Sequence, residues 1–385
     1  MKILIINEYY TPNIQGGAEI SCQLLAESLV KMGHEVFVIT TSDKNEFKIH
    51  NGVSVYYVKI KNLYWPHLNN PGNGRKTIWH LIDLYNIFVG ARIAELLCKI
   101  KPDILHTNVI SGFSCIVWKI SKRYRIPVVH TLRDYYLLCY KATMFNHDKI
   151  CMKLCKLCKY TSYIKRMASL NVNAVVGISN FVLTKHLDYG FFKNVRFSKV
   201  IPNGVPHIQY SSKTRSKTIG FLGTISPSKG IERLIRDFEL SNNGEYLLEI
   251  AGTPNNDYIE FLRKKYSLTH VRFIGRVNAG DFLQRISLLV APSLWEEPFG
   301  RICIEAIANH CPIFVSNRGG MTEIIDDSVG RVFSLEKHDS LQILFKKFFN
   351  GEFKFNFERF DLSKYDNENI ALQYLKIYSG LVYDK

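Results

Sequence analysis

The chain has 385 residues, of which 46% are hydrophobic and 22% charged, values that exclude wholesale disorder and fit two or three globular domains. No apolar run approaches the ~20 residues needed to span a bilayer. The apolar run at the N-terminus meets Glu8 too early for a signal peptide, which predicts a buried strand there and a cytoplasmic protein.

The net charge of +16 is concentrated in the first half of the chain. Residues 1–205 carry 27 Lys and Arg against 12 Asp and Glu, a net +15, whereas residues 206–385 carry 23 against 22, a net +1. A basic half predicts an anionic partner: a phosphate-bearing substrate, an acidic membrane leaflet or nucleic acid. Lysines that only solvate a surface are the alternative.

Short apolar runs alternate with amphipathic stretches through this first half. The stretch 20–32, ending at Gly33, predicts a helix, and 76–100 predicts one long helix stopped by Lys101-Pro102. Continuous apolar runs predict strands covered on both faces at 3–7, 36–40, 53–60, 104–106, 127–130 and 174–177. Such an alternation predicts a parallel, doubly wound sheet.

The alternation pauses at Ile201–Val205 and at the polar stretch 211–217, which we interpret as an interdomain linker. It resumes with a helix at 229–240 and strands at 218–222, 246–251, 271–274, 288–291, 312–316 and 331–333. The expected fold is α/β: two tandem Rossmann-like domains, residues 1–205 and 206–366, that face a central cleft. A C-terminal helix in 367–385 is expected to pack back across their junction.

Two motifs in the second half could carry chemistry. The turn from Gly223 to Gly230 follows a strand and opens a helix, so its N–H groups and Lys229 would seat a diphosphate. Glu297 and Glu305 lie in a loop and in the helix that follows it, where two carboxylates could accept hydrogen bonds from sugar hydroxyls. The structural alternatives are an ordinary turn, a helix-capping Glu297 and a solvated Glu305.

Taken together and in order, these motifs resemble family 4 glycosyltransferases of the GT-B fold. The matching segments are Gly16-Gly17-Ala18-Glu19, Ile201–Val205, Gly223–Gly230, the Glu-x7-Glu pair Glu297 and Glu305, and Gly319–Ile325. Each segment is weak alone, and the set says little about which sugar is transferred. The resemblance implies a retaining, metal-independent transferase that uses a nucleotide-sugar donor and needs no catalytic cofactor.

The resemblance also implies roles for individual residues. Lys229 would bind the donor diphosphate and stabilise charge on the leaving group, Glu305 would hold the donor ribose, and Glu297 would position sugar hydroxyls. Gly17, Gly223, Phe299 and Gly300 would complete the donor site, while Gly16, His130 and Asp134 would lie at the acceptor or in the cleft. Glycines suit positions where backbone approaches a ligand closely.

Two positions depart from the family pattern. Thr224 stands where an arginine is usual, so phosphate binding would rest on Lys229 alone or on a substitute such as Arg301 or Arg276. Arg133 stands where a histidine is common; it would join Lys229 and Glu297 as a catalytic candidate, although it cannot shuttle protons as histidine does. For His130, a hydrogen-bonded histidine inside a strand is an equally weighted alternative.

A cysteine-rich segment follows the strand at 127–130. Cys139, Cys151, Cys155 and Cys158 are compatible with a structural zinc site, and free thiols in a loop are the alternative. The same segment interleaves tyrosines with cations, which suits an anionic membrane surface or a lipid-diphosphate acceptor. Its cations are Lys149, Lys153, Lys156, Lys159, Lys165 and Arg166, and its tyrosines are Tyr160 and Tyr163.

The leading hypothesis is a glycosyltransferase that acts on a polysaccharide or glycolipid acceptor and lies peripherally at the inner face of the cell membrane. A nucleotide-sugar epimerase of the same architecture is one alternative. A zinc-bearing nucleic-acid-binding protein is another, disfavoured because no helix concentrates the basic residues and the glutamate pair would be unexplained. No nucleic-acid partner is therefore expected.

Overall fold

The computed structural model describes residues 1–66, 72–146, 149–205 and 214–383, apart from the side chain of Asn73. Two compact units make up the chain. The first comprises Met1–Met144, Cys151–Gly204 and Tyr365–Lys385, and the second comprises Phe145–Ile150 and Val205–Lys364. The part of the expected linker at 206–213 lies outside the described residues.

The first unit is built on a sheet with the strand order β10-β9-β6-β5-β1-β2-β4-β3, parallel except for β3. Its strands are β1 Lys2–Ile6, β2 Glu35–Ser42, β3 Glu46–His50, β4 Val53–Lys59, β5 Ile104–Thr107, β6 Val128–Leu132, β9 Ala174–Gly177 and β10 Phe197–Val200. All six strands predicted from apolar runs are confirmed. The two edge strands, β3 and β10, were not predicted, because they are largely exposed and rich in polar residues.

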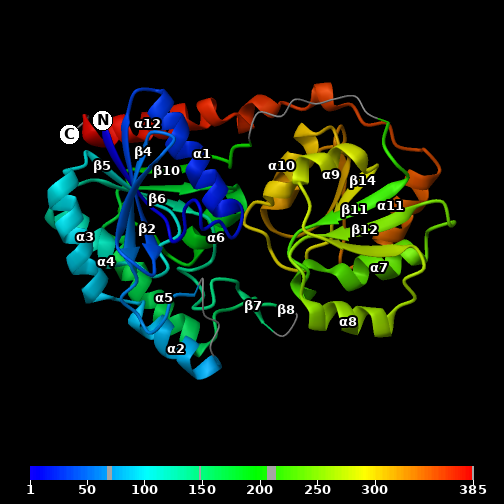
Figure 1. Ribbon diagram of the computed structural model, residues 1–385, viewed down its shortest axis with the longest axis horizontal. Helices are drawn as coiled ribbons and strands as arrows, with labels where there is room; N and C mark the ends of the chain where they lie inside the picture. The colour runs from blue at the N-terminus through cyan, green and yellow to red at the C-terminus, as the bar shows by residue number, and fades with distance from the viewer. Residues whose placement is uncertain (67–71, 147–148, 206–213, 384–385) are drawn as a thin grey trace. The chain divides into compact units, whose positions relative to one another are not determined.

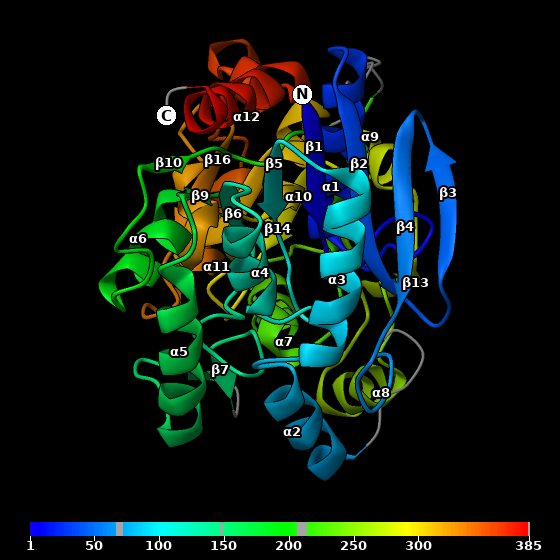
Figure 2. The same ribbon diagram turned by 90° about the vertical axis from the view of Figure 1, so that its left-hand side faces the viewer.

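Helices cover both faces of this sheet. They are α1 Gly17–Lys31, α2 Asn73–Ile82, α3 Ile87–Ile100, α4 Ile116–Arg123, α5 Lys156–Ser169, α6 Asn180–Asp188 and α12 Asn367–Val382. Figures 1 and 2 show α1 and α12 on one face of the sheet and α3, α4 and α5 on the other. The prediction of one helix at 76–100 is wrong, because the helix is interrupted between Asp83 and Asn86. The Asn86 side chain then caps α3 by accepting from the Val89 N–H (3.2 Å).

The C-terminal helix α12 completes the core of the first unit. Its Tyr378 hydroxyl lies 2.7 Å from His106 Nδ1 on β5, and its Tyr374 hydroxyl lies 3.0 Å from Thr131 Oγ1 on β6. His106 Nε2 in turn lies 2.7 Å from Thr131 Oγ1. The helix therefore packs on a buried hydrogen-bonded network as well as on apolar side chains.

The second unit has a fully parallel sheet with the order β13-β12-β11-β14-β15-β16. Its strands are β11 Thr218–Leu222, β12 Leu247–Ala251, β13 Val271–Gly275, β14 Leu288–Ala291, β15 Ile313–Ser316 and β16 Gly330–Phe333. Its helices are α7 Ile231–Glu239, α8 Asn256–Lys265, α9 Ala279–Arg285, α10 Arg301–Ala308 and α11 Ser340–Phe349. Figure 1 shows α7 and α8 on one side of this sheet and α9 and α10 on the other. The six strands predicted in this half are confirmed.

Several short elements complete the chain. They are the 3-10 turns η1 Pro227–Lys229, η2 Gly319–Glu323, η3 Phe357–Arg359 and η4 Leu362–Tyr365, and the antiparallel pair β7 Phe145–Asn146 and β8 Lys149–Ile150. The helix predicted at 229–240 begins later than expected, because Lys229 belongs to η1 and α7 starts at Ile231. Within the described residues, no helix is both long and apolar enough to cross a bilayer.

Replacing Tyr378 by phenylalanine should destabilise the first unit by about 1–3 kcal/mol, because the buried His106 ring nitrogen would lose its partner. The free energy of unfolding from denaturant titration measures this loss. Tyr383→Phe, at an exposed position just beyond α12, is the matched control and should change nothing. Equal stability of the two variants would contradict the proposed contribution of the network.

Candidate active site

Each sheet has one point where the chain reverses the direction in which it adds strands. In the second unit this point lies between the neighbouring strands β11 and β14, and in the first unit between β1 and β5. Open parallel sheets bind ligands beyond the carboxyl ends of the strands at such a point. The predicted site residues follow these strands or their neighbours.

The turn after β11 is held against the end of β14 by backbone contacts. Gly230 has φ 71°, and a Cβ there would lie 2.0 Å from the Pro292 carbonyl oxygen, so only glycine fits. The N–H groups of Leu294 and Trp295 both donate to the Ser228 carbonyl, at 2.9 and 3.1 Å. Lys229 is thereby brought next to the loop that carries Glu297.

Lys229 and Glu297 form a partly buried ion pair. The Lys229 ammonium donates to Glu297 Oε1, and the two side chains are 23% and 16% exposed. The ammonium also lies 4.9 Å from the centroid of the Trp295 ring, where a cation–π contact holds it. Ser293 Oγ lies 3.5 Å from the same carboxylate oxygen. Trp295 was not singled out from the sequence, where a loop tryptophan gives no signal of its own.

Glu305 is paired with Arg301 on α10. Arg301 Nε donates to Glu305 Oε1 at 2.6 Å, and both side chains are largely buried. Burial raises the pKa of the Cys303 thiol, and the negative charges of Glu297 and Glu305 add to that rise. The i,i+4 spacing of Arg301 and Glu305 on a helix could have revealed this pairing from the sequence.

The loop after β15 closes on the Glu297 backbone. Gly319 has φ 64°, and a Cβ there would lie 2.2 Å from the Glu297 carbonyl oxygen. The Gly320 N–H donates to that same oxygen at 2.7 Å. Phe299 is buried and Gly300 precedes α10, whereas Gly223 directly follows β11 and Thr224 is exposed. The structure thus brings the predicted residues of the second unit to one edge of its sheet.

In the first unit, Arg133 is fixed at the end of β6. Its Nε donates to Asn108 Oδ1 at 2.8 Å, and its guanidinium also donates to Asn203 Oδ1. Gly16, just before α1, donates its N–H to Glu19 Oε2 at 2.7 Å, and Gly17 begins that helix. Burial raises the pKa of Glu19, while the positive charge of Arg133 opposes that rise. Asn108 follows β5 and was not recognised from the sequence.

His130 lies within the core of the first unit. Its Nδ1 is 2.9 Å from Thr107 Oγ1, and its ring packs on Trp118 and Phe192. Burial lowers the pKa of His130 to about 3, so the imidazole is neutral at physiological pH. This is the environment of a hydrogen-bonded core histidine, the alternative that the sequence left open.

A buried ionisable cluster near Asp134 was missed. Asp83, at the interruption between α2 and α3, accepts from the Tyr136 hydroxyl (2.7 Å) and from the Gly112 N–H (2.9 Å). Burial raises the pKa of Asp83 to about 7 and that of Asp134 to about 6. Lys165 donates from Nζ to the Tyr136 carbonyl at 2.6 Å and offsets part of both shifts. Asp83 fell inside the helix predicted at 76–100, which hid its inward position.

The four clustered cysteines lie around the loop that follows β6. Interaction with the Cys158 thiol, together with backbone N–H groups of Met144, Lys141 and Thr143, lowers the pKa of the Cys139 thiol. Cys151 and Cys155 lie nearer the surface. Among the described residues, no group of three or more His, Cys, Asp and Glu side chains is arranged to hold a metal ion. A structural zinc ion bound by the four cysteines remains a prediction from the sequence.

Comparison with protein families now decides the assignment. The model described as Glycosyltransferase Family 4 matches residues 15–208, and the model described as Glycosyl transferases group 1 matches residues 207–366. The chain belongs to glycosyltransferase family 4. This glycosyltransferase is 32% identical, over 99% of its own chain and 100% of the relative, to an uncharacterized 42.6 kDa protein in the cps region of Klebsiella pneumoniae.

Solved structures confirm the fold of the glycosyltransferase. Sucrose-phosphate synthase from Thermosynechococcus elongatus aligns with a TM-score of 0.78 at 18% identity, covering 100% of both chains. The Anabaena protein HepE, solved in complex with UDP and glucose, aligns with a TM-score of 0.73 at 17% identity, covering 99% of this chain and 100% of that one. The expectation of two Rossmann-like domains of the GT-B type is thus confirmed.

Asp83 should make the stability of the glycosyltransferase pH-dependent. Its pKa is about 7 in the folded state and about 3.9 in an unfolded chain, so the folded state binds more protons between these values. The free energy of unfolding should therefore fall as pH rises from about 4 to about 7, and Asp83→Asn should flatten that fall. Melting temperatures across this range test the prediction.

The exposed Asp188, replaced by asparagine, is the matched control and should retain the parent profile. An Asp83→Asn profile parallel to that of the parent would show that another group, such as Asp134, dominates the titration.

Proposed function

We propose that the protein transfers a sugar from a nucleotide diphosphate sugar to a polysaccharide or glycolipid acceptor, with retention of anomeric configuration and without a catalytic metal. Transfer would take place at the inner face of the cell membrane, where the protein would be peripheral. The observation that carries the proposal is the pairing of Lys229 with Glu297, beside Arg301 and Glu305, at the strand-order reversal of the second unit.

The ion pair suits a donor diphosphate. Lys229 is held by a carboxylate and an aromatic ring, and a diphosphate carrying more negative charge than Glu297 would compete for the ammonium. As the bond to the sugar breaks, negative charge grows on the leaving diphosphate, and a fixed ammonium stabilises it without reorganisation. Glu297 would then be released to accept hydrogen bonds from hydroxyls of the transferred sugar.

The second carboxylate suits the nucleoside part of the donor. Arg301 fixes one oxygen of Glu305, which orients the carboxylate and leaves acceptor capacity for ribose hydroxyls. That HepE was solved with UDP and glucose supports a uridine diphosphate sugar as the first donor to test. In the first unit, Arg133 and Asp134 are the candidates for contacts with the acceptor.

The acceptor is inferred from relatives and from charge. The relative from K. pneumoniae is named for a cps region, which supports a role in assembling a polysaccharide. The net +15 of residues 1–205 supports an acceptor that carries phosphate or lies on an acidic membrane leaflet. Both observations favour a lipid-linked or growing glycan over a free sugar.

Lys229→Ala and Glu305→Ala should each reduce transfer by about 10²–10³-fold, because each removes a group that meets charge or hydroxyls of the donor. A thermal-shift screen of nucleoside diphosphates and their sugars first identifies the donor, since a bound ligand raises the melting temperature. Transfer rates with that donor then compare the variants.

Lys265→Ala removes a lysine from an exposed ion pair with Glu232 on the same unit and serves as the control. Parent-like turnover of Lys229→Ala or Glu305→Ala would refute the site assignment. Conversion of the donor to an epimer in the absence of any acceptor would instead favour the epimerase alternative.

Chelation should leave the transfer rate unchanged, because the Lys229 ammonium would take the role that a divalent cation has in metal-dependent transferases. Rates with and without EDTA measure this, and NMR of the product reports the anomeric configuration. Loss of activity that added Mg²⁺ or Mn²⁺ restores would contradict metal independence, and an inverted product would contradict retention.

A further inference from the structure

The segment that begins with β8 has an unusual charge pattern. From Lys149 to Leu187 the chain carries seven Lys and Arg residues and no Asp or Glu. One of these cations, Lys165, is buried and bonded to the Tyr136 carbonyl, with its ammonium 3.5 Å from the Tyr136 ring centroid. The mechanism proposed above uses none of the remaining cations, so they require another explanation.

The outer face of α5 combines these cations with large apolar and aromatic side chains. Tyr160 is 61% exposed and Tyr163 55%, and Met152 in the preceding loop is 82% exposed. Lys156, Lys159, Tyr160, Tyr163, Arg166 and Met167 recur at helical spacing, so they share one face of α5. Tyrosine and lysine side chains that present an apolar body and a polar tip are typical of a membrane–water interface.

A pocket of about 350 Å³ opens on this face. It is lined by Lys153, Leu154, Lys159, Ser162, Tyr163, Arg166 and Tyr189. The Arg166 guanidinium donates to the Tyr189 carbonyl at 3.3 Å, which orients it at the pocket wall. Among the described residues, Lys153, Lys159 and Arg166 form no ion pair within 4.0 Å with an acidic group. Three cations with hydroxyl groups between them are complementary to a phosphate ester.

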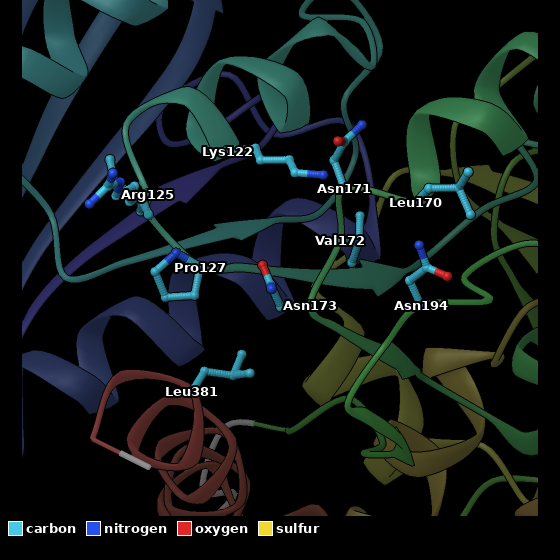
Figure 3. Close-up of a pocket in the computed structure, with 10 residues that line it drawn as sticks. Lys122, Arg125, Pro127, Leu170, Asn171, Val172, Asn173, Asn194 and Leu381 are labelled. Atoms are coloured by element: carbon cyan, nitrogen blue, oxygen red, sulfur yellow. The ribbon is translucent and has the colours of Figure 1, made fainter. Parts of the chain in front are cut away.

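The basic surface continues onto the neighbouring helices. Figure 2 shows α3, α4 and α5 side by side on one face of the sheet. A pocket of about 470 Å³ on α3 and α4 is lined by Tyr85, Ile87, Lys119, Arg123 and Tyr124, among others. Figure 3 shows a third pocket, at the end of α4, where Lys122 and Arg125 lie at one side. Cations and apolar side chains are thus interleaved on α5 and on the α3–α4 pair.

We propose that the outer face of α5, extended by α4, binds an anionic lipid bilayer, with the phosphate of a lipid headgroup in the pocket formed by Lys153, Lys159 and Arg166. This deepens the proposed function, on which it rests, by naming the surface that meets the membrane. The exposed Met152, Tyr160 and Tyr163 enter the headgroup region, whereas the lysines contact the negative surface. Exposed apolar side chains of this size distinguish the surface from one that binds only polyanions.

Vesicle co-sedimentation tests the proposal with the full chain. The protein should bind phosphatidylcholine vesicles that contain phosphatidylglycerol and should bind pure phosphatidylcholine weakly. Lys153→Gln/Lys159→Gln should lower the affinity by about 25-fold, since each lysine near an anionic surface contributes about fivefold. Lys346→Gln/Lys347→Gln, which removes the same charge from exposed positions on α11, should leave the affinity unchanged. Equal losses in the two double variants would overturn the assignment of the surface.

Two further experiments distinguish binding to a lipid bilayer from binding to other ligands. Met152→Ser/Tyr160→Ser keeps every charge and should also weaken binding, because the apolar anchors are lost; unaltered binding would mean that the surface does not enter the bilayer. Inorganic phosphate at the concentration of the lipid phosphate should leave the protein on the vesicles. Complete release by inorganic phosphate would overturn the lipid assignment in favour of a free phosphate ligand.

The outcome is separable from the proposed function. The Lys153→Gln/Lys159→Gln variant should keep the parent melting temperature and the parent shift on adding the nucleotide, since both positions are exposed and lie in the other unit from Lys229. Lys229→Ala should still bind vesicles. Loss of vesicle binding by Lys229→Ala, or loss of the nucleotide shift in Lys153→Gln/Lys159→Gln, would contradict this separation.

Discussion

The second unit depends on holding an ammonium and a carboxylate together at the edge of a parallel sheet. Two partly buried charges of opposite sign tolerate their surroundings only because each has the other, and removing one would leave the other uncompensated. Their contact is set by backbone rather than by long flexible side chains. Gly230 lets the turn after β11 touch the end of β14, and Gly319 lets the loop after β15 touch the Glu297 backbone. Three neighbouring strands therefore fix the geometry of one ion pair.

The first unit meets a different constraint, because polar groups lie deep in its core. His106 and Thr131 on neighbouring strands are satisfied by Tyr378 and Tyr374 of α12, a helix that arrives only at the end of the chain. Arg133 donates to two asparagine oxygens at the carboxyl edge of the same sheet. Buried polar networks are costly when incomplete, so the first unit needs its C-terminal helix to pair these groups as well as to cover apolar surface.

The buried parallel strands could be predicted from the sequence because such a strand is a continuous apolar run. The prediction of helices failed where apolar residues continued at helical spacing but tertiary contacts interrupted the helix. Residues 76–100 have apolar residues at helical spacing throughout, yet the helix is interrupted. Asp83 turns inward because it accepts hydrogen bonds from Tyr136 and Gly112, and Asn86 caps a new helix. The edge strand β3 was not predicted because its apolar residues, Phe47 and Ile49, alternate with polar ones and do not form a continuous apolar run.

The candidate site, like the fold, could be predicted from the sequence only in part. Lys229, Glu297 and Glu305 could be found because their order along the chain resembles a family, but the partners that hold them could not. Trp295 and Asn108 have no distinguishing local pattern, and whether His130 faces ligand or core depends on Trp118 and Phe192, which come from distant segments. Local motifs thus identify candidate groups, whereas long-range packing decides which of them reach the surface.

The uneven distribution of charge along the chain agrees with the different ligands proposed for the two units. The proposed donor site needs one well-placed cation whose field is balanced by nearby carboxylates, and residues 206–385, which include that site, carry 23 Lys and Arg against 22 Asp and Glu. Attraction to an extended anionic surface needs many unbalanced cations instead, because each contributes little and is screened beyond about 10 Å. The absence of any acid between Lys149 and Leu187 meets that second requirement. Adding acids there would create local ion pairs and remove the long-range attraction, so the pattern is the one that the proposed membrane surface requires.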